Sequence, residues 1–400
     1  MTRSGPSYGQ VAGAGFAIIA VTFGLARYSY GLFLPDVEEE FGLTKSWLGL
    51  IASGSYAGYI VSTVVSLQIS GVVGPRAPIV VGGCIAILGM ALVGLSSTPV
   101  VLAIGVVLAG ASPGFVFAPI SDAVVRAVER ERQNRAWTVI NSGNGMGILI
   151  AGLVALGLGL NWRWAWLAFA GLALVAVFWN AAVMPSGRDH RNGGRLPRLR
   201  PRWFLKGESY PLFACSFLVG VVTTIYWTFA TSVIDGSQAV SFFANTIGGG
   251  LGNGDLRIVF WTILGMAGVL GACAGDLISR FGLRRTLQLT CIAMGMSVGL
   301  LASLPDSPLA LIASALVFGA TFILVTGEIG IWSVHVFFSR PSAGFGATFL
   351  IFALGALIGP AVAGLATERF GLSAVFFATA VIGGSIVLLA PRREIHSMAR

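Results

Sequence analysis

The sequence predicts an all-α membrane protein whose twelve transmembrane helices form two similar six-helix bundles. Three observations predict this fold class. Hydrophobic residues make up 56% of the 400 residues and charged residues only 10%, whereas roughly 25% of a soluble domain is charged. Apolar stretches long enough to cross a bilayer recur along the whole chain. Short motifs of the first half also return in the second half after a nearly constant interval.

The internal repeat has an offset of 205 to 208 residues, about half of the chain length. Repeated pairs are Gly74 and Gly282, Asp122 and Glu328, Arg135 and Arg340, and Gly147 and Gly355. Internal repeats of membrane proteins usually frame a substrate path at the interface between the two copies. We therefore expect two pseudo-symmetric halves.

A spanning helix needs about 20 apolar residues, and twelve stretches meet this requirement. They lie at 11–34, 47–70, 78–96, 99–124, 136–160, 164–184, 210–234, 257–277, 286–304, 308–334, 343–366 and 372–390. The widest gap between spans is rich in arginine and poor in apolar residues. We therefore predict an N-terminal bundle at 1–184, a basic cytoplasmic linker at 185–209 and a C-terminal bundle at 210–400.

The distribution of basic residues predicts the orientation in the membrane. With the amino terminus inside, twenty of the 25 Lys and Arg residues fall in inner loops and termini, and one, Arg27, lies within the first span. The outer loops hold the other four, Lys45, Arg163, Arg257 and Arg369. Inner loops of membrane proteins carry an excess of Lys and Arg. We expect both termini in the cytoplasm, and no nucleic-acid partner despite the net charge of +9.

Two loop motifs and a helix motif carry a resemblance to a known superfamily. A short Gly/Arg loop, Gly71-Val-Val-Gly-Pro-Arg76, follows span two, and Gly275-Asp-Leu-Ile-Ser-Arg-Phe-Gly-Leu-Arg-Arg285 follows span eight. Span eleven carries Gly355-x3-Gly359-Pro360. With twelve spans in a 6+6 arrangement, the whole chain resembles the major facilitator superfamily. The resemblance implies the major facilitator fold, with two bundles that rock about a central site. The first-half loop departs from the family pattern because Gly71 stands where an acid is usual.

A closer likeness is to the bacterial YbfB/YjiJ-like branch, which has some kinship to monocarboxylate carriers. It is carried by Phe23-Gly-Leu-Ala-Arg-Tyr-Ser-Tyr-Gly-Leu-Phe-Leu-Pro35, Asn161-Trp-Arg-Trp164 and Gly275-Asp-Leu-Ile278. The resemblance implies a multi-pass secondary transporter of a bacterial inner membrane, working as a symporter or an antiporter.

Arg27 is the main candidate for a substrate contact. A charged side chain within a span costs ~2.5–3.5 kcal/mol on insertion scales and marks a functional site by default. Phe23 and Tyr30 stand one helical turn away on the same face. A guanidinium beside aromatic rings can hold a carboxylate, sulfonate or phosphate. The alternative is a structural arginine that reaches the interface or bonds to backbone carbonyls.

Further polar side chains within spans are expected to face the protein interior, because lipid contact is costly for them. Asn141 and Asn144 stand one turn apart in span five, and Thr223, Tyr226 and Trp227 share a face of span seven. We predict that they line the substrate site, although interhelical hydrogen bonds are an alternative role for such residues.

Asp122 and Glu328 are repeat-equivalent acids near the inner ends of spans four and ten. We predict that they form salt bridges that hold an inner gate closed. The arginines proposed as their partners are Arg76, Arg135, Arg280, Arg284 and Arg340. The alternative is proton coupling through Glu328, with His335 nearby in the sequence.

Two motifs of enzyme chemistry are absent from the sequence. It has no Gly-Lys of a phosphate-binding loop and no HExxH, so we expect no enzyme, no cofactor and no metal. We predict a secondary active transporter, working as a monomer, that moves a small organic anion. The alternatives are efflux of drugs or hydrophobic metabolites and, in another class, a non-transporting membrane sensor.

Overall fold

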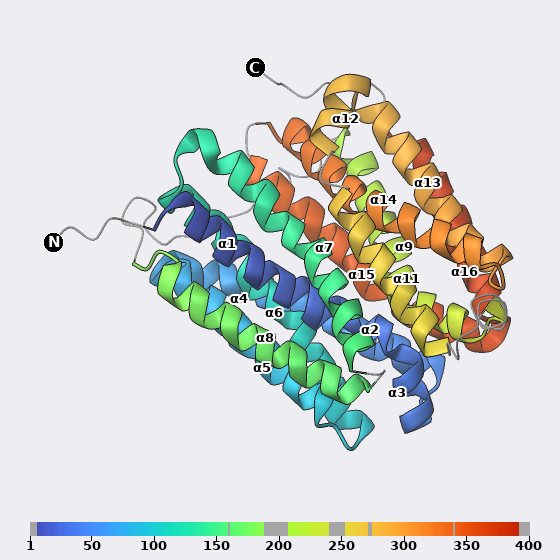
Figure 1. Cartoon of the computed structure of the whole chain (residues 1–400). Coiled ribbons are helices and arrows are strands. Elements are labelled where there is room, and N and C mark those ends of the chain that lie inside the picture. The colour runs from blue at the N-terminus through green and yellow to red at the C-terminus, as the bar shows by residue number, and fades with distance from the viewer. Residues whose placement is uncertain are drawn as a thin grey trace. The chain divides into compact units, whose positions relative to one another are not determined.

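The structure, a computed structural model, describes residues 6–158, 161–187, 207–239, 253–270, 274–338 and 341–391, which contain helices and no strand (Figure 1). The helices of the first half are α1 Tyr8–Ile19, the π-helix η1 Ala20–Tyr28, α2 Ser29–Leu32, α3 Leu34–Phe41, α4 Lys45–Val73, α5 Arg76–Gly94, α6 Pro99–Ala127, the short η2 Arg130–Arg132, α7 Gln133–Gly157 and α8 Trp162–Val183. Those of the second half are α9 Ser209–Asp235, α11 Asn253–Leu270, α12 Ala274–Phe281, α13 Leu283–Ser303, α14 Pro308–Val336, α15 Pro341–Phe370, α16 Leu372–Ser385 and η5 Ile386–Leu389.

Eleven stretches of the described chain are helical, long and apolar enough to cross a membrane. They coincide with eleven of the twelve predicted spans. The remaining prediction, 257–277, overlaps α11, an 18-residue helix, and the first residues of α12. The all-α class is therefore confirmed. Most of the predicted linker, residues 188–206, lies outside the described residues.

The chain divides into two compact units, which are described separately here. The first comprises Met1–Tyr30 and Gly54–Pro197, and the second comprises Gly31–Ser53 and Arg198–Arg400. The segment that joins the first two spans therefore packs with the second unit. The division predicted from the sequence at 184 and 210 stays a prediction.

The same helix pairs occur within each unit. In the first, α1 packs on α7, and α5 packs on both α6 and α8. In the second, α9 packs on α15, and α13 packs on both α14 and α16. In each half, therefore, the first span packs on the fifth, and the third span packs on the fourth and on the sixth. This matching arrangement is what the sequence repeat predicts.

The repeat extends to helix starts and turns. Thr98 caps α6 and Ser307 caps α14, each with a side-chain oxygen that accepts a backbone N–H three residues on, and a proline follows each cap. Such a cap satisfies a free N–H, and proline suits the first helical position. The repeat-equivalent Gly74 and Gly282 have φ of 83° and 81°, a left-handed conformation that glycine adopts without steric cost.

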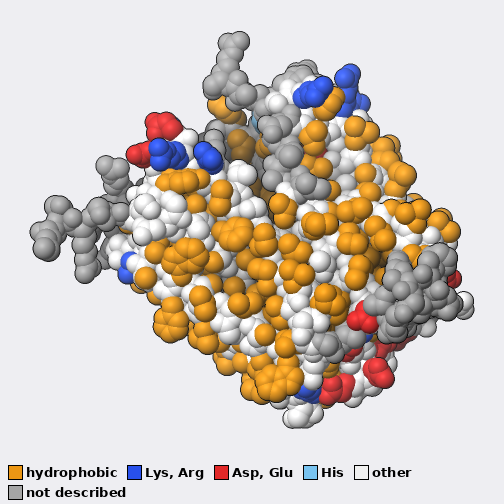
Figure 2. Space-filling view, in the orientation of Figure 1, with side chains coloured by type: hydrophobic (Ala, Val, Ile, Leu, Met, Phe, Trp, Pro, Cys, Tyr) orange, Lys and Arg blue, Asp and Glu red, His pale blue; other side chains and the backbone are white. Residues whose placement is uncertain are grey.

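Large hydrophobic side chains are exposed along the spans of both units. Val61 and Phe178 of the first unit are 63% and 71% exposed, and Leu289 and Met296 of the second are each 66% exposed. Figure 2 shows hydrophobic side chains spread widely over the visible helices. Exposed apolar surface of this extent suits contact with lipid rather than water.

Candidate functional site

A π-helical stretch within the first span carries Arg27. The nine residues Ala20–Tyr28 form this stretch between α1 and α2. The Ser29 hydroxyl donates to the Gly24 carbonyl oxygen, five residues back, at 3.4 Å. A side chain at Gly24 would collide with the backbone of Gly147 in α7, so the span packs closely there. π-helical segments are rare and are frequent at functional sites.

Arg27 lies over aromatic rings inside the first unit. Its guanidinium carbon is 4.3 Å from the ring centre of Tyr56, 4.2 Å from that of Tyr59 and 5.8 Å from that of Phe23. The side chain is only 8% exposed. Attraction between a cation and an aromatic face, worth roughly 0.5–2 kcal/mol, offsets part of the cost of burying the charge.

Among the residues that the structure describes, no carboxylate balances the charge of Arg27. No acidic side chain of the described residues pairs with it, and its Nε has no hydrogen-bond partner there. A buried charge without a counter-ion is costly. The first unit thus holds a buried cation with a free donor, which is an arrangement able to bind an anion.

Aromatic rings continue from Arg27 through the first unit. Phe23 lies 6.4 Å from Tyr59 and 5.9 Å from Phe117, and Phe117 lies 5.8 Å from Trp137, all between ring centres. Phe23 is buried, whereas Tyr59, Phe117 and Trp137 are half-buried. We call these four residues, from η1, α4, α6 and α7, the aromatic row.

Of the residues predicted beside Arg27, Phe23 lies within reach of the guanidinium, and Tyr30 is buried in α2. The sequence analysis missed Tyr56 and Tyr59, which lie closer. Their three-residue spacing in span two, which places two rings on one helical face, was a usable signal. Which helix that face meets depends on tertiary packing.

The two asparagines of α7 differ in environment. Asn141 is exposed, whereas Asn144 is half-buried, and its Oδ1 has no hydrogen-bond partner among the described residues. Asn144 stands between Gly143 and Gly147, whose Cα atoms both face the first span. A substrate contact for either asparagine stays a prediction.

The candidates of α9 lie in the core of the second unit. The Thr223 hydroxyl donates to the Val219 carbonyl oxygen at 2.7 Å. The Tyr226 hydroxyl is 2.8 Å from Ser314 Oγ, and its ring stacks on Phe318 with centres 3.6 Å apart. Trp227 packs edge-on against Trp261. All three are buried, and their role as substrate contacts stays a prediction.

Two of the predicted gate residues in the first unit form hydrogen bonds with a hydroxyl or a carbonyl group. Asp122 is exposed and accepts a hydrogen bond from Ser70 at 3.2 Å. Arg76 donates from Nε to the Met184 carbonyl oxygen at 2.5 Å. Arg135 is exposed on α7.

In the second unit Glu328 is fully buried and accepts a hydrogen bond from the Thr290 hydroxyl at 2.8 Å. Its other oxygen has no hydrogen-bond partner in the described part of the chain. Arg280 is exposed over the Phe281 ring, Arg284 is exposed, and Arg340 lies outside the described residues. Within those residues neither Asp122 nor Glu328 pairs with an arginine, and the gate stays a prediction.

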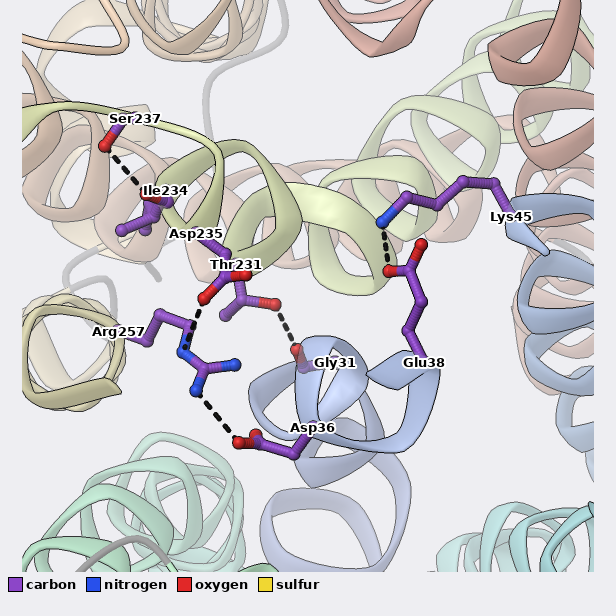
Figure 3. A network of polar contacts seen from close by, with 9 residues as sticks. All are labelled: Gly31, Asp36, Glu38, Lys45, Thr231, Ile234, Asp235, Ser237 and Arg257. Atoms are coloured by element: carbon purple, nitrogen blue, oxygen red, sulfur yellow. Dashed lines mark hydrogen bonds and ion pairs between the residues drawn. The ribbon is translucent and has the colours of Figure 1, made fainter. Parts of the chain in front are cut away.

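A second polar network, which the sequence analysis did not single out, lies in the second unit (Figure 3). Arg257 of α11 donates from Nη2 to Asp36 of α3 at 2.9 Å, and its Nε is 3.6 Å from Asp235 of α9. Thr231 of α9 donates to the Gly31 carbonyl oxygen, and Lys45 pairs with Glu38. The network fastens the segment after the first span to α9 and α11.

The matching helix pairs and the polar groups buried within spans define a membrane transporter of the major facilitator type. Residues 19–391 match the family model described as "Uncharacterised MFS-type transporter YbfB", and the chain belongs to this family.

Similar proteins agree with this class. The nucleoside transporter NupG, in a mutant form, superposes with a TM-score of 0.76 at 13% identity over 95% of this chain and 98% of that chain. A bacterial homologue of the human lysosomal transporter Spinster, inward-facing and unoccupied, gives 0.74 at 15% identity over 97% and 98%. These identities show a shared fold alone. The family and these neighbours are transporters and not enzymes.

A curated relative carries a different description. "Transcription regulatory protein OpdE" of Pseudomonas aeruginosa PAO1 is 26% identical over 399 residues, which are 96% of this chain and 93% of that protein. The likeness runs over nearly the full length of both chains.

Proposed function

We propose that this transporter is a secondary active carrier that moves a small organic anion, with Arg27 binding the negative group. The observation that carries the proposal is the buried Arg27 guanidinium, which has no carboxylate partner among the described residues. An anionic substrate would supply the missing counter-charge. Hydrogen bonds between a guanidinium and a carboxylate are about twice as strong as neutral ones.

Alternating access of two bundles would carry the anion across the membrane, as in other transporters built from repeats. We infer that the protein works as a monomer in a bacterial inner membrane with both termini in the cytoplasm. The excess of basic residues in the predicted inner loops supports this orientation.

Gating and coupling would use the two repeat-equivalent acids, the buried Glu328 and the exposed Asp122. Glu328 carries an oxygen without a partner in the described chain, so its carboxyl could exchange a proton during transport or meet an arginine in another state. In the first case the carrier is coupled to protons, and in the second Asp122 and Glu328 close the inner gate with arginines of the inner loops.

Efflux of hydrophobic compounds is the second candidate, and the aromatic row favours it. Four aromatic rings in contact would suit a neutral flat molecule. The two functions differ in their need for Arg27, because a neutral compound gains nothing from the charge.

The test is a thermal-shift screen of purified protein with organic anions and their neutral amides, since a ligand of the native state raises its apparent stability. Hits are repeated with Arg27→Lys and Arg27→Ala. The matched control is Arg369→Ala, which also removes an arginine over an aromatic ring, but an exposed one. We expect affinity for anions to be highest with Arg at position 27, lower with Lys and lowest with Ala. The lost charged hydrogen bond should cost ~1.5–3 kcal/mol of binding free energy. The Arg369→Ala control should bind anions as the wild type does. Undiminished anion affinity of folded Arg27→Ala would refute the proposal.

A further inference from the structure

We propose that the substrate is an aromatic monocarboxylate, with its carboxylate on Arg27 and its ring against the aromatic row. This inference rests on the proposed function and adds the chemical class of the substrate. It uses residues of the first unit only, which are Arg27, Phe23, Tyr59, Phe117 and Trp137.

The row begins at the charge itself. Tyr59 lies 4.2 Å from the guanidinium carbon and 6.4 Å, edge-on, from Phe23. The Tyr59 ring therefore contacts both the cation and Phe23, and Phe23 in turn contacts Phe117. A ligand whose carboxylate binds the free Nε of Arg27 would place its body beside Tyr59.

Three rings of the aromatic row are more exposed than the aromatic side chains of the packed core. Core aromatics of this protein such as Trp166 and Phe169 are at most 1% exposed. Tyr59, Phe117 and Trp137 are instead half-buried, although they touch other rings. Their ring planes meet at 54° to 68°, in edge-on and tilted contacts.

An aromatic partner fits these rings better than an aliphatic one. Edge-to-face and offset contacts between aromatic rings add about 0.5–1.5 kcal/mol to their area burial, which corresponds to a gain of roughly two- to twelvefold in affinity. The aromatic row offers such contacts from rings that neighbour one another.

The charge of the site limits the acidic group. Arg27 is the one basic residue in the interior of a predicted span, since Arg257 stands at the first position of its span. A single guanidinium balances a single negative charge and offers a planar fork that matches a carboxylate. A dianion such as a phosphate monoester would bring one more charge than this residue can balance.

The experiment measures binding of four probes by the purified protein: benzoate, cyclohexanecarboxylate, acetate and benzamide. We expect benzoate to bind at least threefold more tightly than cyclohexanecarboxylate, acetate to bind more weakly than either, and benzamide to show no binding. Equal affinity of benzoate and cyclohexanecarboxylate would overturn the aromatic preference.

Variants of the aromatic row test whether its rings cause the preference for benzoate over cyclohexanecarboxylate. Trp137→Leu should lower the benzoate-to-cyclohexanecarboxylate ratio at least twofold without changing acetate binding, and Trp137→Phe, which keeps a ring, should restore most of it. Trp164→Leu is the matched control, because Trp164 lies in the same unit and is 61% exposed. A ratio that is the same in Trp137→Leu, Phe117→Leu and the control would overturn the role of the row.

The organic-anion function and the aromatic preference can be refuted separately. If Arg27→Ala abolishes binding of all three anions but the ring makes no difference, only the aromatic inference is overturned. If benzamide binds as well as benzoate and Arg27→Ala has no effect, the organic-anion function itself is overturned and efflux of neutral compounds takes its place.

Discussion

Arg257 Nη2 lies 2.9 Å from Asp36 Oδ1, and this pair joins α11 to the short helix α3 within the second unit. Arg257 is 6% exposed, and Asp235 lies on its other side at 3.6 Å from Nε. Burial raises the pKa of the Asp36 carboxyl above its ordinary value, although Arg257 acts in the opposite direction. Ionised Asp36 therefore costs more in the folded protein than in water.

The raised pKa determines how Asp36 affects stability with pH. Because the folded protein holds this proton more tightly than the unfolded chain, the contribution of Asp36 is fully present below its ordinary pKa of about 3.9 and is lost as pH rises through the raised pKa. Asp36→Asn imitates the protonated group and can still accept from Arg257.

We expect Asp36→Asn to be at least as stable as the wild type at pH 7. Asp36→Ala should be less stable by about 1–3 kcal/mol, since it leaves Arg257 without this acceptor. Unfolding midpoints of the purified proteins between pH 4 and pH 8 measure both effects. An equal loss of stability in Asp36→Asn and Asp36→Ala would show that the negative charge itself is required.

A second prediction concerns the repeated glycine contacts. Gly147 in α7 lies against the backbone of Ala20 and Gly24, and its repeat partner Gly355 in α15 lies against that of Phe217. Gly147→Ala should destabilise the protein by about 1–3 kcal/mol through overpacking. The control Gly157→Ala is in the same helix with no neighbour within 4 Å, and should gain up to about 1 kcal/mol.

Unfolding midpoints in detergent compare the two variants. Gly355→Ala and its control Gly384→Ala, where a Cβ meets nothing within 4 Å, repeat the test in the second unit. If Gly147→Ala is as stable as Gly157→Ala, the close contact between α7 and the first span is not required.

The fold could be predicted because its signals are local. Span length, the repeat and the turn glycines are each readable within a few residues, and Gly74 and Gly282 indeed share a left-handed φ. The surroundings of Arg27 could be predicted only in part. Phe23 follows from helical spacing, but Tyr56 and Tyr59 come from another helix, and one sequence does not say which helix faces which.

The second polar network shows the same limit. Arg257 and Asp36 stand more than 200 residues apart in the sequence, and only the fold brings them together. The π-helix around Arg27 was also not predictable, because no residue type encodes an i to i−5 hydrogen bond as proline or glycine encodes a turn.

A third prediction tests Glu328. If Glu328 helps to close the inner gate, its charged carboxylate pairs with an arginine in the outward-open state and loses that pair in the inward-open state. Glu328→Gln removes this difference and should shift the protein toward the inward-open state. Spin labels at Val125 and Phe338, which are 63% and 74% exposed in α6 and just after α14, report the distance between the two halves. Asp122→Asn is the repeat-equivalent variant and should shift the distance in the same direction.

An unchanged distance distribution in both variants would count against the gate. Transport by Glu328→Gln that becomes independent of pH, with the distances of the wild type, would instead identify a proton site. The hydrogen bond from Thr290 should persist in this variant, since the glutamine side-chain oxygen also accepts.

The last prediction concerns how the first unit tolerates Arg27 without a bound anion. The Tyr59 ring lies 4.2 Å from the guanidinium carbon, so Tyr59→Leu should lower the free energy of unfolding by about 0.5–2 kcal/mol beyond its packing loss. Tyr59→Phe keeps the ring and should lose little. A double-mutant cycle with Arg27→Met isolates the coupling, because the excess cost of Tyr59→Leu should vanish once the charge is gone. Tyr210→Leu is the control, as this tyrosine is 58% exposed. Equal costs of Tyr59→Leu with and without the charge would mean that Tyr59 only packs, and that the buried cation is stabilised by other groups.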